Sequence, residues 1–303
     1  MLLVAAIAWS TPHVRQAPPH ATATGDPVLI AAGDIASCSS SGDEATASIL
    51  ATLPGAIALL GDTVYDSGTA SEFTNCYDPT WGARKADTRP APGNHDYATA
   101  NASGYYGYFG AAAGNPSLGY YSYEIGAWHV VALNSNCSSI GGCGAGSAQE
   151  TWLRADLAAN PAACTLAYWH HPRFSSGSSH GNQAFMQPIW QALSDYGADI
   201  VLSGHEHNYE RFGPQDADGA ADPLGIREFV VGTGGRSHYA FGAAIANSEV
   251  RNSDTFGVLA LTLHPTGYDW QFVPEAGKTF TDSGTGDCQG IGAPILGGED
   301  RDG

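Results

Sequence analysis

The chain has 303 residues, with 12 Lys and Arg against 30 Asp and Glu and a formal net charge of −18 at pH 7. This balance argues against a protein that lies along duplex nucleic acid or an anionic membrane surface, because clustered basic side chains hold both of those partners. With 43% hydrophobic and 14% charged residues, the composition is that of a globular protein and not of a disordered chain.

The chain opens with an apolar run over residues 1–9. A transmembrane helix needs about 20 such residues, so we expect no membrane span. The run suits the apolar part of a secretory signal, and Ala21 to Ala23 offers a small-residue cleavage site, although no basic residue precedes the run. We predict a leader over residues 1–25 and a secreted, periplasmic or extracellular protein. An N-terminal strand or a loose tail is the alternative.

Beyond this segment the elements come in the order of a mixed α/β protein. The apolar runs at 27–32 and 55–60 have the length of buried strands, and the spacing at 43–53 predicts a helix between them. Two adjacent strands are expected at 120–125 and 128–133.

The second half of the chain continues this alternation. Ser147 begins an S-x-x-E pattern, which is typical of a helix start, and the helix is expected to end near residue 159. The later elements are predicted, in order, as strand 164–169, helix 183–196 and strands 198–202, 228–231, 257–263 and 268–273. The last residues are rich in Gly, so we predict one domain over 26–282 and a C-terminal tail over 283–303.

The chain has six cysteines and no C-x-x-C pair, which argues against a zinc ribbon or a thioredoxin-like redox site. Disulfide bonds in an oxidising compartment are the favoured interpretation, and buried thiols are the alternative. Cys137 and Cys143 close a short Gly-rich loop and are the first pair that we predict. The other predicted pairs are Cys38 with Cys76 and Cys164 with Cys288.

Polar side chains gather in short blocks directly after the apolar strands, where open α/β sheets collect their ligands. The blocks are Gly33-Asp34, Gly61 to Tyr65, Gly93 to Asp96, His170 to Pro172 and Gly204 to His207. Their Asp, Asn, Tyr and His side chains make a mixed oxygen and nitrogen donor set that suits Fe, Zn or Mn. So many donors exceed one tetrahedral site and fit two metals bridged by a carboxylate, for which Asp62 is the natural candidate.

The ordered set of blocks resembles the signature of the purple acid phosphatases, within the calcineurin-like metallophosphoesterases. The matching segments are GDTVY from Gly61, GNHD from Gly93, AYWH ending at His170 and GHEH from Gly204, which continues into Tyr209-Glu210-Arg211. The resemblance covers about residues 34–235. It implies a four-layer αββα sandwich with two mixed β-sheets, a fold of the mixed α/β (α+β) class.

Carried over position by position, the resemblance implies two metal ions. Fe(3+) would be held by Asp34, Asp62, Tyr65 and His207. Fe(2+), Zn(2+) or Mn(2+) would be held by Asp62, Asn94, His170 and His205. The first block has Ala36 where the family usually has Gly and other metallophosphoesterases have a His ligand, so Tyr65 would have to complete the first site.

The resemblance implies a secreted phosphohydrolase that cleaves phosphomonoesters by attack of a metal-bound hydroxide on phosphorus, as acid phosphatases do. We expect His95 to bind the phosphate and to protonate the leaving oxygen, with Asp96 orienting its ring. By its distance beyond the fourth block, His180 matches a substrate-contacting histidine of the family, so the resemblance implies a further catalytic group there. His171 and Arg173 are substrate-binding candidates that either reach the phosphate or only pack.

Two other functions stay open at this point. A phosphodiesterase would use the same metals, because the blocks do not distinguish monoesters from diesters. A catalytically silent secreted binding protein would keep the fold and lose a ligand, and no ligand position is missing here apart from Ala36. The expected partner is a small phosphate ester and not duplex nucleic acid, since two bound metals would offset the acidic charge only locally. The sequence leaves the oligomeric state open.

Overall fold

The computed structural model describes residues 25–290. The leader predicted over 1–25 lies outside these residues except for Gly25, and so does the last part of the predicted tail. Two large β-sheets and one two-stranded sheet make up the β-structure. In the described part of the chain, no helix is both long and apolar enough to cross a membrane.

The first large sheet has six strands and contains both the first and the last strand of the described chain. In spatial order its strands are β15 (Ser283–Asp287), β14 (Gly267–Pro274), β13 (Gly257–His264), β1 (Val28–Ala32), β3 (Ala56–Leu60) and β5 (Thr88–Ala91). Strands β1, β3 and β5 run parallel, whereas β13, β14 and β15 pair antiparallel. The carboxyl ends of the three parallel strands therefore meet at one edge of a mixed sheet.

The second large sheet has seven strands. In spatial order they are β12 (Ser248–Asn252), β10 (Tyr209–Phe212), β11 (Arg227–Val231), β9 (Ile200–Ser203), β8 (Cys164–Tyr168), β7 (Trp128–Ala132) and β6 (Tyr121–Ile125). Strands β7, β8, β9 and β11 are parallel, and the outer strands are antiparallel to their neighbours. The two-stranded sheet pairs β2 (Ala36–Ser37) with β4 (Val64–Tyr65).

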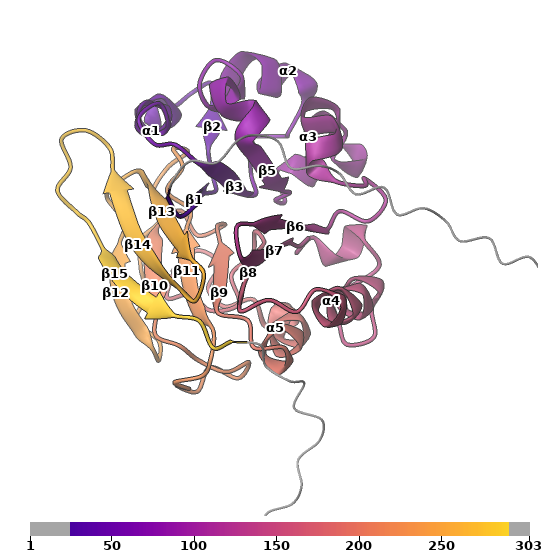
Figure 1. Ribbon diagram of the computed structural model, residues 1–303. Helices are drawn as coiled ribbons and strands as arrows, with labels where there is room; N and C mark the ends of the chain where they lie inside the picture. The colour runs from indigo at the N-terminus through magenta and orange to yellow at the C-terminus, as the bar shows by residue number, and fades with distance from the viewer. Residues whose placement is uncertain (1–24, 291–303) are drawn as a thin grey trace, which may run out of the picture.

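Helices connect the strands of both sheets. The α-helices within residues 25–290 are α1 (Gly42–Leu50), α2 (Ala70–Glu72), α3 (Ser103–Phe109), α4 (Ala148–Ala159) and α5 (Gln187–Asp195). Shorter helical turns lie at Phe73–Tyr77, Trp81–Asp87, Asp96–Ala98, Ala100–Ala102, Gly110–Ala113, Cys137–Ser139 and Ala184–Met186. Figure 1 shows α1, α2 and α3 outside the first sheet and α4 and α5 outside the second. The two mixed sheets thus lie between helical layers, which is the predicted four-layer arrangement.

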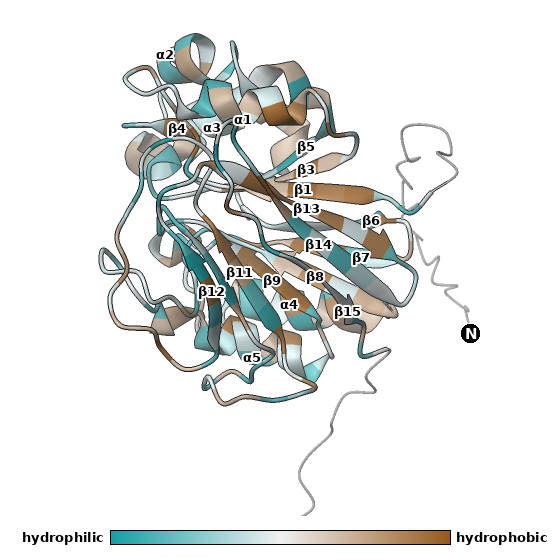
Figure 2. Cartoon of the chain, turned by 90° about the vertical axis from the view of Figure 1, so that its left-hand side faces the viewer, coloured by the Kyte–Doolittle hydropathy of each residue, from teal (hydrophilic) through white to brown (hydrophobic). Residues whose placement is uncertain are grey.

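Apolar residues of the central strands fill the space between the layers. Leu59, Leu202 and Phe229, from β3, β9 and β11, are fully buried. Figure 2 shows β1, β9 and β11 as largely brown ribbons, whereas β12 at the sheet edge is largely teal. Continuous apolar runs are expected for strands that are covered on both faces, and the sequence predictions for the central strands are confirmed for this reason.

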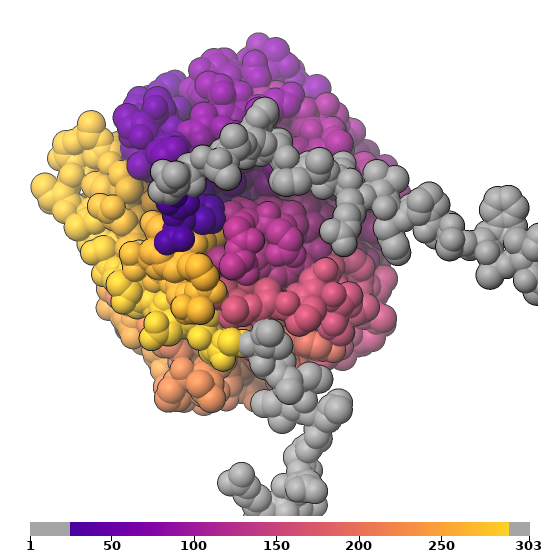
Figure 3. Space-filling model, viewed as in Figure 1, coloured from indigo at the N-terminus to yellow at the C-terminus, as the bar shows by residue number. Residues whose placement is uncertain are grey.

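All six cysteines form disulfide bonds in the predicted pairs: Cys38 with Cys76, Cys137 with Cys143 and Cys164 with Cys288. The last of these joins the first residue of β8, in the second sheet, to the residue after β15, in the first sheet. Figure 3 shows that the first described segment (indigo) and the last (yellow) come to the same face of the molecule.

The predicted tail over 283–303 begins too early, because residues 283–287 form β15 and pair with β14. This strand reads Ser-Gly-Thr-Gly-Asp and has no apolar pattern. A Cβ at Gly284 would lie 2.4 Å from the ring of Trp270, and a Cβ at Gly286 would lie 2.4 Å from the ring of Tyr268. The aromatic rings of β14 fill the places that side chains of β15 would take, so the apolar contact comes from the partner strand.

Candidate metal centre

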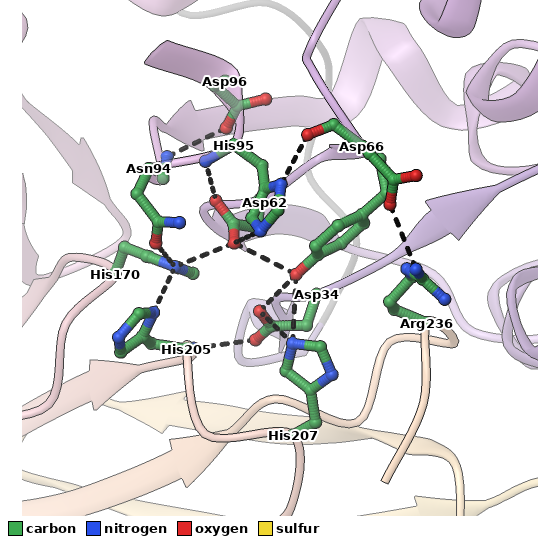
Figure 4. A network of polar contacts seen from close by, with 12 residues as sticks. Asp34, Asp62, Asp66, Asn94, His95, Asp96, His170, His205, His207 and Arg236 are labelled. Carbon is green, nitrogen blue, oxygen red and sulfur yellow. Dashed lines mark hydrogen bonds and ion pairs between the residues drawn. The ribbon is translucent and has the colours of Figure 1, made fainter. Parts of the chain in front are cut away.

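The predicted ligands lie where parallel strands of both large sheets end. In the first sheet, the ligands that follow β1, β3 and β5 are Asp34, Asp62 and Asn94. In the second sheet, the ligands that follow β8 and β9 are His170 and His205. Figure 4 shows these side chains pointing toward one another from the two sheets. Residues far apart in the sequence therefore meet at the carboxyl ends of the strands.

Three of the predicted ligands have a left-handed backbone, which residues other than glycine rarely adopt. The angle φ is 60° at Asp34, 48° at Asp62 and 70° at His205. The carboxylate of Asp34 accepts a hydrogen bond from the backbone N–H of His205 at 2.8 Å. The carboxylate of Asp62 accepts one from the backbone N–H of His95 at 2.7 Å. A strained backbone that its surroundings hold in place is typical of functional sites.

Two glycines of the sequence blocks leave room for the carboxylates. A Cβ at Gly93 would lie 2.1 Å from Oδ1 of Asp62, and a Cβ at Gly204 would lie 2.7 Å from Oδ2 of Asp34. Both separations are too short for any side chain to exist there. The GNH and GH blocks thus require glycine because a side chain at either position would displace a carboxylate of Asp62 or Asp34.

Tyr65 is central to the first set of ligands. Its hydroxyl lies 2.7 Å from Oδ1 of Asp34, 3.0 Å from Oδ2 of Asp62 and 3.1 Å from Nε2 of His207. Nε2 of His207 is in turn 3.2 Å from Oδ1 of Asp34. The donors expected for the first metal therefore converge on one point.

His170 is central to the second set. Its Nε2 lies 3.1 Å from Oδ1 of Asn94, 3.2 Å from Oδ2 of Asp62 and 3.1 Å from Nδ1 of His205. Oδ2 of Asp62 thus contacts a member of each set, which is the position of a bridging carboxylate.

The donor set fits a bound cation, because more lone pairs converge than the available protons can serve. Nδ1 of His170 lies 2.8 Å from the carbonyl oxygen of Leu60, so it carries the ring proton and donates it there. In the neutral ring, Nε2 presents a lone pair to the oxygen atoms of Asp62 and Asn94, and without a cation it takes up a proton instead. A cation at this point would bind lone pairs that otherwise repel one another.

His207 is oriented by two contacts outside the ligand set. Its Nδ1 pairs with Oγ of Ser237 at 2.7 Å. Its ring stacks on that of Tyr239, with 3.9 Å between centroids and 9° between planes. Such contacts decide which ring nitrogen is free to bind a metal. Nε2 of His207 therefore stays directed at Asp34 and Tyr65.

The charges of the site also favour a cation. Burial alone would lower the pKa of His170, but Asp62 and Asp34 raise it to about 9. Burial would raise the pKa of Asp62, yet His170 and His95 bring it well below its ordinary value. Burial and then the charges of Asp34 and Asp62 raise the pKa of the Tyr65 hydroxyl well above 10. A cation here would take the place of the proton on His170 and allow Tyr65 to ionise.

His95 lies beside the cluster, with Nε2 4.0 Å from Oδ2 of Asp62 and a side chain that is 36% exposed. The structure corrects the role expected of Asp96, because Nδ1 of His95 contacts the backbone carbonyl of Asp66 at 2.6 Å. Asp96 is fully buried and accepts a hydrogen bond from the backbone N–H of Gly93 at 2.8 Å. Burial and the charge of Asp62 raise the pKa of Asp96 to about 7. Asp96 therefore shapes the loop that carries His95 and does not touch its ring.

Imidazole rings cover the second set of ligands. The ring of His180 lies 4.0 Å from that of His205, and the ring of His171 lies 4.3 Å from it, between centroids. Nδ1 of His171 pairs with Oγ of Ser135 at 2.8 Å. Burial and the neighbouring His170 lower the pKa of His171 to about 3, so this ring is neutral. The structure brings His171 and His180 together with the predicted ligands.

Arg173 is the predicted substrate residue that the structure does not bring to the cluster. Its guanidinium donates to the carbonyl of Ala217 at 2.8 Å and lies over the ring of Phe174 at 4.3 Å. The residue is 8% exposed. Among residues 25–290, its side chain touches packing neighbours and none of the predicted ligands, so the packing role is the one that the structure supports.

Sequence reasoning missed Arg236, which lies next to the first set of ligands. Its guanidinium donates to Oδ1 of Asp66 at 3.1 Å and lies 5.1 Å from the ring centroid of Tyr65. Arg236 and the two residues that orient His207 all follow the Gly-rich segment 232–235. That segment is the one signal in the sequence that could have located them.

Comparison with known proteins identifies the family of the chain. The family model of the calcineurin-like phosphoesterases matches residues 22–209. Purple acid phosphatase 15 of Arabidopsis thaliana is 29% identical over an alignment of 218 residues, and the match covers 60% of this chain and 40% of that protein. Purple acid phosphatase 18 of the same plant is 32% identical over an alignment of 131 residues, and the match covers 41% of this chain and 28% of that protein. The chain thus spans less than half the length of these relatives.

Two solved structures share the fold. Purple acid phosphatase PPD1 from yellow lupin seeds has a TM-score of 0.69 at 19% identity, covering 86% of this chain and 53% of its own. GAP50, described as the anchor in the inner membrane complex of Plasmodium, has a TM-score of 0.66 at 16% identity, covering 89% of this chain and 90% of its own. The family match spans more than half of the chain and includes every predicted ligand. The chain therefore belongs to the calcineurin-like phosphoesterases and is purple acid phosphatase-like within them.

Proposed function

We propose that the protein is a secreted, metal-dependent hydrolase of phosphomonoesters, acting in the manner of an acid phosphatase. The observation that carries the proposal is the position of Asp62, whose Oδ2 lies 3.0 Å from the Tyr65 hydroxyl and 3.2 Å from Nε2 of His170. One carboxylate oxygen between two sets of donors is what a two-metal site for displacement at phosphorus requires. The similarity to purple acid phosphatases supports the same conclusion.

We infer Fe(3+) at the set that contains Tyr65 and Fe(2+), Zn(2+) or Mn(2+) at the set that contains His170. A phenolate is an oxygen donor that favours a ferric ion, and imidazole, amide and carboxylate donors suit the divalent ions. When bound, such ions would lower the pKa of water and draw charge away from the phosphoryl oxygens. The protein's own contribution is to hold the donors at fixed positions on rigid strand ends.

His95 is our candidate for the group that binds a phosphoryl oxygen and returns a proton to the leaving alcohol. Because Nδ1 of this ring contacts the carbonyl of Asp66, a proton that the ring transfers must be carried on Nε2. His180 is our candidate for a second substrate contact, since its ring stacks on His205. His171 would exclude water beside the same ligand, because it is neutral and closely packed.

Secretion is supported by the disulfide bonds. Three disulfide bonds link the chain. Bonds of this kind persist in oxidising compartments outside the cytosol. The acidic surface that accompanies the net charge of −18 would keep such a protein soluble there.

Two alternatives define the test. A phosphodiesterase would use the same centre on diesters. A catalytically silent binding protein is the alternative from another class, and GAP50, described as an anchor, has the same fold, so the fold alone does not decide. The complete set of ligands favours an enzyme.

The deciding experiment measures bound metals together with hydrolysis of 4-nitrophenyl phosphate and bis(4-nitrophenyl) phosphate by the same preparation. We expect two bound metals and faster hydrolysis of the monoester. Faster hydrolysis of the diester would show that the protein is a phosphodiesterase and not a phosphomonoesterase. If the metal-loaded protein hydrolyses neither ester, the proposal that it is an enzyme is wrong.

Tyr65→Phe tests the ferric site by its colour. A ferric ion bound to a phenolate absorbs visible light, so the band should disappear in this variant. Tyr97→Phe is the matched control, because the Tyr97 hydroxyl pairs with that of Tyr106 and with no predicted ligand. A band that persists in Tyr65→Phe would remove Tyr65 from the ligand set.

A further inference from the structure

Three buried glutamates near the metal centre have no part in the function proposed so far. Glu206, Glu210 and Glu228 are all fully buried. Glu206 lies in the turn between two metal ligands, and the other two belong to β10 and β11. A buried carboxylate is costly unless it accepts hydrogen bonds. Most of the groups that donate to these carboxylates belong to one segment, residues 173–181.

Glu228 and Glu210 hold the first part of this segment. Glu228 accepts hydrogen bonds from the backbone N–H groups of Arg173 at 3.1 Å and Phe174 at 3.0 Å. Glu210 accepts one from the backbone N–H of Ser176 at 2.7 Å. The segment belongs to no named helix or strand. The carboxylates therefore supply the acceptors that a regular element would otherwise provide.

Glu206 holds the end of the segment. Its Oε1 accepts hydrogen bonds from the backbone N–H groups of His180 at 2.5 Å and Gly181 at 2.7 Å. A Cβ at Gly177 would lie 2.1 Å from the carboxyl carbon of Glu206, so the carboxylate fills the space of the missing side chain. Glu206 thus connects the turn that carries two metal ligands directly to the backbone of His180.

The position of the His180 ring depends on that backbone. The ring lies 4.0 Å from the ring of His205 and 5.8 Å from that of Tyr239, between centroids. In the part of the chain that the structure describes, the ring nitrogens of His180 form no hydrogen bond with the protein. They are therefore free for a substrate, and only the backbone and ring contacts hold the ring in place.

We propose that Glu206 is a positioning residue, which holds the ring of His180 over the metal ligand His205 through the backbone of His180. This inference rests on the proposed function, in which His180 contacts the substrate. A substrate contact that moves by about 1 Å can change a rate by about 100-fold. Loss of the Glu206 carboxylate should therefore impair the reaction while every metal ligand stays present.

The first measurement is amide hydrogen exchange at residues 180 and 181, in metal-free and in metal-loaded protein. We expect exchange to be faster by about 10-fold or more in Glu206→Ala, because both N–H groups lose their acceptor. Glu206→Gln keeps an acceptor oxygen and should retain nearly the wild-type protection. Unchanged exchange in Glu206→Ala would overturn the inference, whatever the activity.

The second measurement is kcat/KM with 4-nitrophenyl phosphate. It should fall by about 10- to 100-fold in Glu206→Ala and by less than about 3-fold in Glu206→Gln. Gly177→Ala should reproduce the loss, since its methyl group would displace the carboxylate. Faster exchange with an unchanged kcat/KM would show that the segment is held but that its position does not matter, and would overturn the inference.

Asp199→Ala is the matched control. Asp199 is also a buried carboxylate that accepts two backbone hydrogen bonds, from Thr165 at 2.8 Å and Gln289 at 2.7 Å. Its loss should leave both kcat/KM and the exchange of residues 180 and 181 unchanged. An equal loss of activity in Asp199→Ala would show that Glu206→Ala acts by general destabilisation and would contradict the positioning role.

A double variant tests whether Glu206 acts through His180. In the His180→Ala background, Glu206→Ala should cause little further loss, because the ring that it positions is absent. Fully multiplicative losses would overturn the inference.

Failure of the proposed function would be distinguishable from failure of this inference. If the wild-type, metal-loaded protein hydrolyses no ester, calorimetric binding of inorganic phosphate replaces kcat/KM as the second readout. Weaker phosphate binding in Glu206→Ala than in Asp199→Ala would still support the positioning role. Equal affinities in the wild type and Glu206→Ala would contradict it.

Discussion

Two buried histidines, His170 and His129, share a raised pKa and differ in their surroundings. Carboxylates outweigh burial at both rings and raise the pKa of each to about 9. Nδ1 of His129 lies 2.7 Å from Glu124 and its Nε2 lies 2.8 Å from Asp156. Each ring nitrogen of His129 therefore has one carboxylate and donates one proton to it, so this histidine has all its hydrogen bonds satisfied inside the core.

His170 has more acceptor atoms around its ring than its two nitrogens can donate protons to. The carbonyl of Leu60 uses its Nδ1, while the oxygen atoms of Asp62 and Asn94 share its Nε2. One proton cannot serve all of these lone pairs. Burial and pKa are alike in the two histidines, so the excess of acceptors around one nitrogen is what distinguishes His170 as the candidate metal ligand.

The largest effect is expected for Asp62→Ala, which removes a carboxylate beside His170. Because Oδ2 of Asp62 belongs to both sets of donors, its loss should remove at least one metal and lower kcat/KM by about 1,000-fold or more. Elemental analysis of the purified variant gives the metal content, and circular dichroism checks that it is folded. Retention of both metals would contradict the bridging role.

His129→Ala is the converse test. Asp156 would lose a close partner in a partly buried place, so the free energy of unfolding should fall by about 3–4 kcal/mol, measured by urea denaturation. The metal content and kcat/KM should be those of the wild type. A loss of metal in this variant would mean that the two histidines are not independent.

The pH dependence of stability tests whether His129 is charged in the folded protein. The folded-state pKa of His129 is raised from 6.5 to about 9, so the stabilisation from its charged form is complete below about pH 6.5 and is lost as the pH rises through about 9. The difference in unfolding free energy between the wild type and His129→Gln should shrink by about 2–3 kcal/mol over that interval. A constant difference would show that His129 is neutral in the folded protein.

Arg173→Lys extends the comparison to a buried cation and has the smallest expected effect. The variant loses the hydrogen bond to Ala217, so stability should fall by about 1 kcal/mol. The KM for 4-nitrophenyl phosphate should change by less than about 2-fold, because the guanidinium does not reach the cluster. A tenfold rise in KM would return Arg173 to the substrate site.

The candidate ligands could be located in the sequence because their blocks resemble the signature of a known family, and several of these blocks follow apolar strands. Asp34, Asp62 and His205 follow apolar strands, where ligands gather, and their assignment to the metals stays a prediction from the resemblance. The central strands were predictable for a related reason, since an unbroken apolar run has no other place than a core.

Other features depend on contacts that the residue types do not encode. The ring of His95 is held by the backbone carbonyl of Asp66, and every residue has such a carbonyl. The role of Glu206 depends on a loop that folds back over it. Strand β15 lacks an apolar pattern because aromatic rings of β14 occupy its side-chain positions. In each case the deciding partner is remote in the chain or belongs to the backbone.

The bond between Cys164 and Cys288 has a practical consequence. A protease that cuts the connection between β14 and β15 would release no fragment, because the end of the first sheet would still be attached covalently to β8 in the second. The cut protein would run as one band on a gel without reductant and as two bands after reduction. Preparations of this protein are therefore best judged intact on reducing gels, where a hidden cut becomes visible.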